Sequence, residues 1–163
     1  MNLQRYFLVS SYALLTVSLL MLAATRQIDG VSLGLYTCTL VAGVLIDTDR
    51  LQLNLPTRLA NGLLILWLLV ALAEWQLFRL SPVLVIVHFV LFASALKLLR
   101  RKSNRDWIWL YLVSFCHVLM SAGLMLGTKF LLLLVLYLFA AISTFVAYQI
   151  RSAQQAFQQS QST

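Results

Sequence analysis

The stretch YFLVSSYALLTVSLLMLAAT, from Tyr6 to Thr25, contains no charged side chain. A helix rises about 1.5 Å per residue, so roughly 20 residues cross a bilayer core about 30 Å thick. Arg5 before the stretch is reminiscent of a signal peptide, but the run is long for one and no A-x-A-like cleavage site ends it. We therefore interpret residues 6–25 as a retained membrane helix.

Five further apolar stretches follow the first one, separated by polar turns. We expect helices over residues 6–25, 31–46, 59–78, 82–99, 107–128 and 130–150. The stretches are continuously apolar rather than alternating, which argues against a lipid-facing barrel, and a spanning helix satisfies its own backbone hydrogen bonds. The sequence predicts an all-α integral membrane bundle of six transmembrane helices over residues 1–151. A polar cytoplasmic tail at 152–163 has too little apolar content to fold alone.

Composition supports this prediction. Hydrophobic residues make up 61% of the chain and charged residues only 10%, whereas a soluble domain is about half apolar and about a quarter charged. A lipid bilayer is therefore the expected partner of the apolar surface. The net charge of +7 comes from basic residues between the apolar stretches, and no basic helix face or binding motif indicates nucleic acid.

The basic residues also predict the orientation. If the N-terminus is inside, three basic residues fall outside, namely Arg26, Arg79 and Lys129. The other nine fall inside: Arg5, Arg50, Arg58, Lys97, Arg100, Arg101, Lys102, Arg105 and Arg151. Cytoplasmic loops carry an excess of Lys and Arg. We therefore expect a multi-pass protein of the cytoplasmic (inner) membrane with both ends in the cytoplasm.

One basic cluster joins the fourth and fifth stretches. It comprises Lys97, Arg100, Arg101, Lys102 and Arg105. We expect this cluster to fix the topology and to contact anionic lipid headgroups, with Lys97 extending its long side chain toward them. Trp107 and Trp109 follow directly and are expected at the membrane interface, where tryptophan is enriched.

Besides Lys97, one acidic residue and two histidines lie within the apolar stretches, where such groups are costly and often functional. Glu74 and His88 are on segments joined by a tight turn and can meet, either as a proton-handling pair or as a hydrogen-bonded pair near the outer interface. His117 lies near mid-depth beside Cys116, but adjacent helical residues point about 100° apart. We therefore expect a neutral His117 that is hydrogen-bonded to another helix, and no catalytic, cofactor or metal site.

Two glycine pairs have the G-x-x-x-G spacing that lets membrane helices approach closely. They are Gly30 with Gly34 and Gly123 with Gly127. Both pairs lie near the ends of the expected helices, so turn formation explains them equally well.

Several short stretches together carry a family resemblance. They are Leu3-Gln4-Arg5-Tyr6-Phe7, Ser10–Leu15, Leu53-Asn54-Leu55-Pro56, and Lys97-Leu98-Leu99-Arg100 followed by Arg105-Asp106. On these residues the chain resembles the N-terminal membrane domain of the TgpA-type transglutaminase-like proteins of bacteria. The resemblance covers about residues 1 to 150, and its most specific piece is the connection from Lys97 to Arg105-Asp106.

The resemblance implies a membrane-anchoring domain that is not catalytic by itself and that gathers partners through its helix faces. In that family a further crossing and an extracytoplasmic transglutaminase-like domain follow, and the catalytic cysteine, histidine and aspartate lie in that later domain. Cys116 and His117 match no part of that motif, so no catalytic residue is carried over. We expect either a segment of a longer protein with such a downstream domain or a stand-alone membrane part.

Two other functions remain open from the residues alone. A small oligomeric transporter or channel would use Glu74 and His88 as part of a polar pathway. A quinone- or haem-binding membrane subunit would use His88 and His117, whose expected depths in the membrane do not match.

Overall fold

The computed structural model describes residues 3–51, 56–78, 82–124 and 127–161, and within these ranges it contains six helices. They are α1 (Leu3–Ala24), α2 (Gly30–Asp47), α3 (Thr57–Phe78), α4 (Pro82–Leu98), α5 (Asn104–Leu124) and α6 (Thr128–Gln161). Each apolar stretch identified in the sequence therefore corresponds to one helix over most of its length, and the prediction of an all-α fold is confirmed within the described residues.

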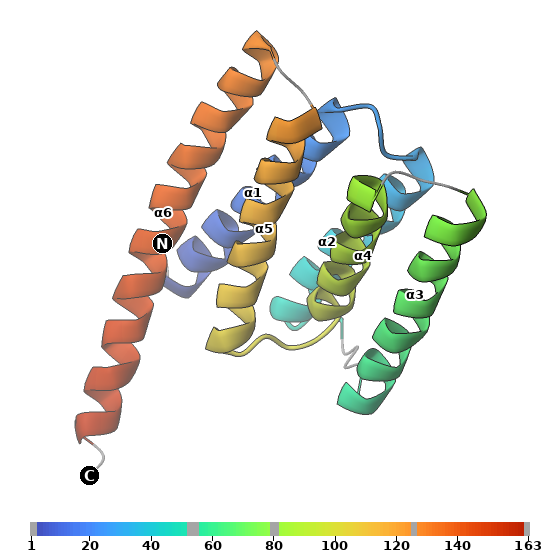
Figure 1. The fold of residues 1–163 in the computed structure, drawn as a ribbon. Helices are drawn as coiled ribbons and strands as arrows, with labels where there is room; N and C mark the ends of the chain where they lie inside the picture. The colour runs from blue at the N-terminus through green and yellow to red at the C-terminus, as the bar shows by residue number, and fades with distance from the viewer. Residues whose placement is uncertain (1–2, 52–55, 79–81, 125–126, 162–163) are drawn as a thin grey trace.

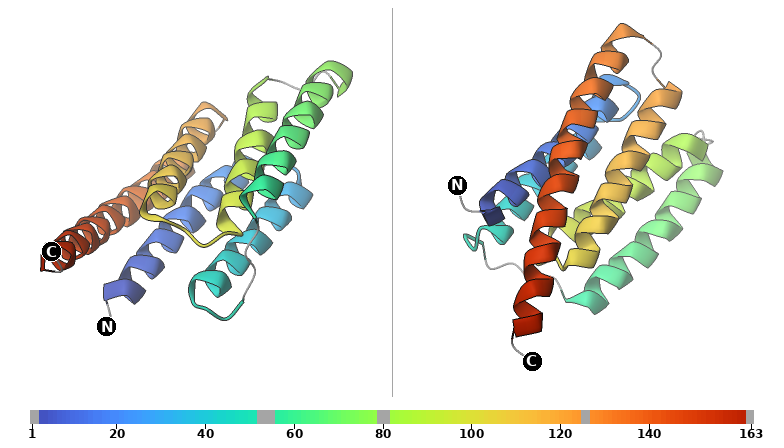
Figure 2. Two further views of the ribbon diagram at one scale, coloured as in Figure 1. Left: turned by 90° about the horizontal axis from the view of Figure 1, so that it is seen from below. Right: turned by 90° about the vertical axis from the view of Figure 1, so that its left-hand side faces the viewer.

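Helix α1 is the centre of the bundle, and α3 and α6 are its two edges (Figures 1 and 2). Helix α1 packs most extensively on α6 and α5, α2 packs on α4, and α3 packs on α4. In the most apolar part of α1, 61% of residues are buried, against 17% in α6. The fold is thus a bundle in which the first helix supplies much of the core.

Hydroxyl groups join α1 to α5 and to α6. Thr144 Oγ1 of α6 donates to the backbone oxygen of Ser10 at 2.9 Å. Ser11 Oγ lies 2.7 Å from Tyr111 Oη of α5. Because lipid is as apolar as the helix surfaces, membrane helices associate through small residues and such interhelical hydrogen bonds.

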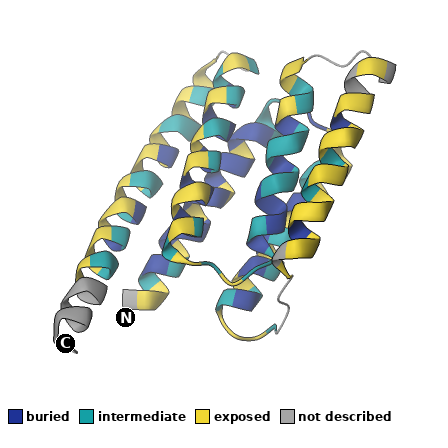
Figure 3. Ribbon diagram, turned by 60° about the horizontal axis from the view of Figure 1, so that its bottom comes forward, coloured by how far each residue is buried: buried dark blue, intermediate teal, exposed yellow. Residues whose placement is uncertain are grey.

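The outward faces of the helices are apolar. Figure 3 shows exposed residues along the outer sides of the bundle, and many of them are large hydrophobic side chains such as Leu66, Leu132 and Phe139. Four of the described helices, α1, α2, α5 and α6, are long and apolar enough to cross a membrane. Shorter apolar segments lie in α3 (Arg58–Ala73) and α4 (Pro82–Leu98). These features are those of a membrane protein.

The C-terminal segment differs from expectation. We expected residues 152–163 to form a tail that does not fold, but α6 continues through this segment to Gln161. The segment does not have to fold alone, because it extends a helix that already exists and so avoids the cost of nucleation. Glutamine, the commonest residue in the segment, is also a good helix former.

The glycine at a close helix contact is Gly43 rather than either predicted pair. A Cβ added to Gly30, Gly34, Gly123 or Gly127 would meet no atom within 4 Å. A Cβ on Gly43 would lie 3.0 Å from Tyr12 Oη and 3.1 Å from the Leu98 backbone oxygen. Gly43 therefore allows α2 to approach α1 and α4 at one end of the bundle.

Candidate functional site: a buried ion pair at one end of the bundle

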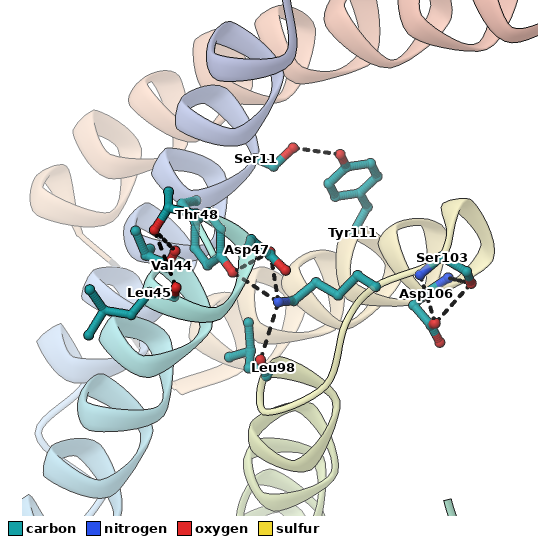
Figure 4. A network of polar contacts seen from close by, with 11 residues as sticks. Ser11, Val44, Leu45, Asp47, Thr48, Leu98, Ser103, Asp106 and Tyr111 are labelled. Carbon is teal, nitrogen blue, oxygen red and sulfur yellow. Dashed lines mark hydrogen bonds and ion pairs between the residues drawn. The ribbon is translucent and has the colours of Figure 1, made fainter. Parts of the chain in front are cut away.

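Asp47 and Lys102 form an ion pair between the last residue of α2 and the connection from α4 to α5. Lys102 Nζ lies 2.8 Å from Asp47 Oδ2, and the side chains are only 1% and 9% exposed. Tyr12 of α1 donates from its hydroxyl to the same carboxylate oxygen at 2.7 Å. Three parts of the chain that are distant in sequence therefore meet at this pair (Figure 4).

The Lys102 ammonium group uses all its hydrogen-bonding capacity. It has three donors, and its partners are Asp47, Tyr12 Oη at 2.9 Å and the Leu98 backbone oxygen at 3.2 Å. The rings of Tyr12 and Trp107 both lie 5.5 Å from Nζ, close enough for cation–π attraction. This arrangement leaves no free donor for a substrate. We therefore regard the contacts of Lys102 with Asp47, Tyr12 and Leu98 as a structural lock, meaning a set of hydrogen bonds that holds α1, α2 and α4 together.

Burial has the largest effect on the pKa of Lys102. It disfavours the charged ammonium and lowers the pKa of Lys102, while the hydrogen bond and charge of Asp47 oppose that shift. The carboxylate also needs a cation, because the C-terminal end of α2 carries a partial negative charge from the helix dipole. The two side chains therefore compensate each other in a place where either one alone is unfavourable.

Lys102 differs from the rest of the basic cluster, because its ammonium is enclosed by Asp47, Tyr12 and Leu98 rather than turned outward. The rest of the cluster is more exposed. Lys97 Nζ is paired with Asp106 Oδ1 at 2.6 Å, and Arg101 is paired with Asp49, both largely exposed. Arg105 is exposed and Arg100 is half-buried. Lipid contact by these four residues stays a prediction.

Ser103 and Asp106 explain why α5 begins three residues before the expected Trp107. Ser103 Oγ accepts from the Asp106 backbone N–H at 3.3 Å, and Asp106 Oδ2 accepts from the Ser103 backbone N–H at 3.1 Å. This reciprocal arrangement is a capping box, which starts a helix. Trp107 therefore lies inside the helix, and its side chain is 2% exposed.

At the opposite end of the bundle, His88 meets Asp29. His88 Nε2 lies 3.1 Å from Asp29 Oδ1. Asp29 also caps α2 by accepting from the Ser32 backbone N–H at 2.8 Å. Slight burial acts to raise the pKa of Asp29, but the Ser32 hydrogen bonds and nearby His88 outweigh it and hold this pKa below its usual value. The side chain of Glu74 lies outside the described residues, so its predicted pairing with His88 stays a prediction.

His117 is buried in the interior of the bundle, edge-on to Tyr36, with ring centroids 5.9 Å apart. We expected a hydrogen bond to another helix. Neither ring nitrogen of His117 nor the Tyr36 hydroxyl has a hydrogen-bond partner among the described residues. His117 is therefore enclosed by the bundle, and the predicted hydrogen bond is not present in the described part of the chain.

The Asp47–Lys102 pair is the feature that the sequence reasoning missed. One signal was present: an aspartate at the C-terminal end of a helix opposes the helix dipole, so it requires a cation from elsewhere. Five nearby cations could have served, and sequence spacing does not select Lys102 among them. Among the described residues, no group of three or more histidine, cysteine or acidic side chains is placed to hold a metal ion.

Comparison of the chain with known protein families, with curated proteins and with solved structures finds no match.

Proposed function

We propose that this chain is a membrane-anchoring domain that crosses the bilayer six times, with both ends in the cytoplasm. Its resemblance to the N-terminal membrane domain of TgpA-type transglutaminase-like proteins extends the proposal. The chain would hold a transglutaminase-like protein at the cytoplasmic membrane and present its helix faces to partners.

The observation that carries the anchoring role is the Asp47–Lys102 pair. It fastens α1, α2 and the α4–α5 connection to one another with every ammonium donor in use. A closed, fully hydrogen-bonded lock favours a rigid scaffold over a polar pathway through the bundle.

The arrangement of charges supports the orientation. Arg151 lies over the Phe7 ring at 4.5 Å, and Lys102 reaches Tyr12, so basic residues from α6 and the α4–α5 connection gather beside the start of α1. We call this the basic end of the bundle, defined by Arg5, Arg50, Arg101, Lys102 and Arg151. A basic end facing the cytoplasm agrees with the usual bias of membrane proteins.

The lengths of α3 and α4 support six crossings. Helix α3 has 22 residues, with Arg58–Ala73 as its apolar part, and α4 has 17, while spanning helices range from about 17 to 25 residues. Helix α4 is at the lower limit, and Lys97 in its last turn can extend toward the interface.

Topology mapping tests the orientation. Green fluorescent protein and alkaline phosphatase are each fused after Thr128, Arg151 and Thr163 in separate fusions expressed in bacteria. We expect fluorescence without phosphatase activity after Arg151 and Thr163, and the reverse after Thr128. Phosphatase activity after Thr163 would overturn the orientation.

An activity assay tests the anchoring role separately. The purified chain is expected to show no turnover of a glutamine- and lysine-containing peptide, because the resemblance places the catalytic residues elsewhere. Turnover that survives replacement of Cys116 and His117 by alanine would indicate contamination, whereas turnover lost in that variant would overturn the anchoring role.

A further inference from the structure

A groove lies between the N-terminal half of α1 and the C-terminal end of α2, with a volume of about 910 Å³. This is within the range of about 300–1,000 Å³ that is typical of ligand sites. The two helices are joined at their other ends by residues 25–29, and α1 packs much less on α2 than on α5 or α6. The α1–α2 groove is therefore a gap in the packing of the bundle.

The groove has an apolar part and a basic mouth. Leu8, Val9 and Ala13 of α1 line the apolar part, opposite Val44 and Leu45 of α2. Arg5 and Arg50 lie at the mouth and are exposed. A groove with an apolar part and a positively charged mouth suits an amphiphile that has an apolar chain and an anionic head.

The charge at the mouth is positive because the nearby acids are already neutralised. Asp47 is paired with Lys102, and Asp49 is paired with Arg101. Arg5 and Arg50 have no ion-pair partner among the described residues. Two guanidinium groups are thus available to an anion, and guanidinium matches phosphate in geometry.

The length of the groove matches one leaflet of a bilayer. It extends along α1 from Gln4 to Thr16, which is about 18 Å of helix, headgroup end included, at about 1.5 Å per residue. Half of a hydrocarbon core about 30 Å thick is about 15 Å. An acyl chain whose phosphate lies at the mouth would therefore end near the bilayer midplane.

We propose that the α1–α2 groove binds one anionic phospholipid of the cytoplasmic leaflet. Its phosphate lies between Arg5 and Arg50, and an acyl chain lies along Leu8, Val9 and Ala13. The leaflet named here rests on the proposed orientation, but binding itself does not. A topology result against that orientation would move the lipid to the other leaflet, whereas loss of binding would remove the site.

Native mass spectrometry of the purified full-length chain in detergent tests the site. Phosphatidylglycerol is titrated against the wild type and against Arg5→Gln/Arg50→Gln. Each basic residue near an anionic headgroup contributes about 1 kcal/mol, so removing two is expected to weaken binding roughly 30-fold. The matched control is Arg26→Gln/Lys129→Gln, which removes two exposed charges at the opposite end and is expected to leave binding within about twofold.

Two further arms separate the possible sources of the phosphate and of the apolar contact. Ala13→Trp fills the groove without changing its charge and is expected to abolish tight binding of phosphatidylglycerol. Phosphatidylcholine with the same acyl chains is expected to bind weakly to every variant. Equal binding of the two lipids would overturn the proposal. It would also be overturned if Ala13→Trp bound both inorganic phosphate and phosphatidylglycerol as tightly as the wild type does.

Discussion

Lys102 and Asp47 are charged side chains that the fold removes from water. Removing an ion from water is expensive, and the attraction between partners repays this cost only when the remaining hydrogen-bonding groups are satisfied. Here Lys102 donates to Asp47, Tyr12 and the Leu98 carbonyl, and Asp47 also accepts from Tyr12. The pair is therefore much more sensitive to the loss of one member than to the loss of both.

Replacing Lys102 alone is expected to destabilise the bundle strongly. Lys102→Met leaves the Asp47 carboxylate buried without its cation, so the free energy of unfolding should fall by about 3–5 kcal/mol. In Lys102→Met/Asp47→Asn the amide oxygen still accepts from Tyr12, and most of that loss should be recovered. Unfolding in mixed micelles, followed by circular dichroism over increasing dodecyl sulfate, measures both variants.

Arg101→Met is the control for this experiment. The Arg101–Asp49 pair is exposed on both sides, so its removal should change stability by less than about 1 kcal/mol. A single Lys102→Met variant as stable as the wild type, or a double variant no better than the single, would contradict the expected coupling.

His117 presents the opposite situation, a buried polar ring with no described partner. Leaving such a group without a hydrogen bond costs about 1–3 kcal/mol, and an apolar replacement of similar size removes that cost. We expect His117→Leu to raise the free energy of unfolding by about 1 kcal/mol, measured in the same micelle assay. A loss of more than about 2 kcal/mol would instead show that His117 has a partner in the membrane.

Helix α2 shows how single residues determine the ends of an element. Asp29 caps its start. At its end, Asp49 has a positive φ of 55°, and the backbone N–H groups of Asp49 and Arg50 donate to the carbonyls of Ile46 and Leu45. This pattern is a Schellman motif, which usually has glycine at the left-handed position. It holds α2 so that it ends at Asp47, where Lys102 can reach the carboxylate.

The start of α2 gives a prediction about pH. Asp29→Asn keeps an effective cap and removes the charge beside His88. The pKa of Asp29 in the fold lies below the ordinary value of 3.8, so its ionised form contributes stability above pH 3.8, and this contribution is lost as the pH falls through the lowered pKa. We expect the stability difference between wild type and Asp29→Asn to be constant near neutral pH and to shrink below about pH 4.

Thermal denaturation of both proteins between pH 6 and pH 3 measures that difference. Asp29→Ala, which lacks any cap, should be less stable than Asp29→Asn by about 1 kcal/mol at every pH. A difference between wild type and Asp29→Asn that grows on acidification would contradict the assigned role of the carboxylate.

At the scale of the molecule, the closeness of α1, α2 and α4 depends on Gly43. Exchanging glycine for alanine inside a helix normally stabilises it by roughly 0.5–1 kcal/mol. We expect that gain for Gly62→Ala in α3, where an added Cβ meets no atom within 4 Å. Gly43→Ala should instead lose about 1–3 kcal/mol, because the methyl group pushes on the Leu98 carbonyl and on Tyr12. Unfolding of both variants in micelles measures whether the free energy of unfolding rises for Gly62→Ala and falls for Gly43→Ala.

The sequence predicts the helices of this bundle well, because a membrane helix is defined by the length of an apolar stretch, such as Tyr6–Thr25. It predicts their ends less well. Ser103 and Asp106 start α5 earlier than the apolar stretch does, and α6 runs beyond it to Gln161. Packing could not be derived from composition. Lys102 and Arg101 are neighbours of the same charge, and only the three-dimensional fold buries one and exposes the other.

The span of the Asp47–Lys102 pair has a consequence for synthesis. The two residues are 55 positions apart, and ribosomes add about 5–20 residues per second, so the aspartate exists for roughly 3–11 s before its lysine has been made. During that interval the Asp47 carboxylate lacks the cation that it pairs with in the fold. The contact between α1, α2 and the α4–α5 connection can therefore form only after residue 102 has been made, whatever the first two helices do before that.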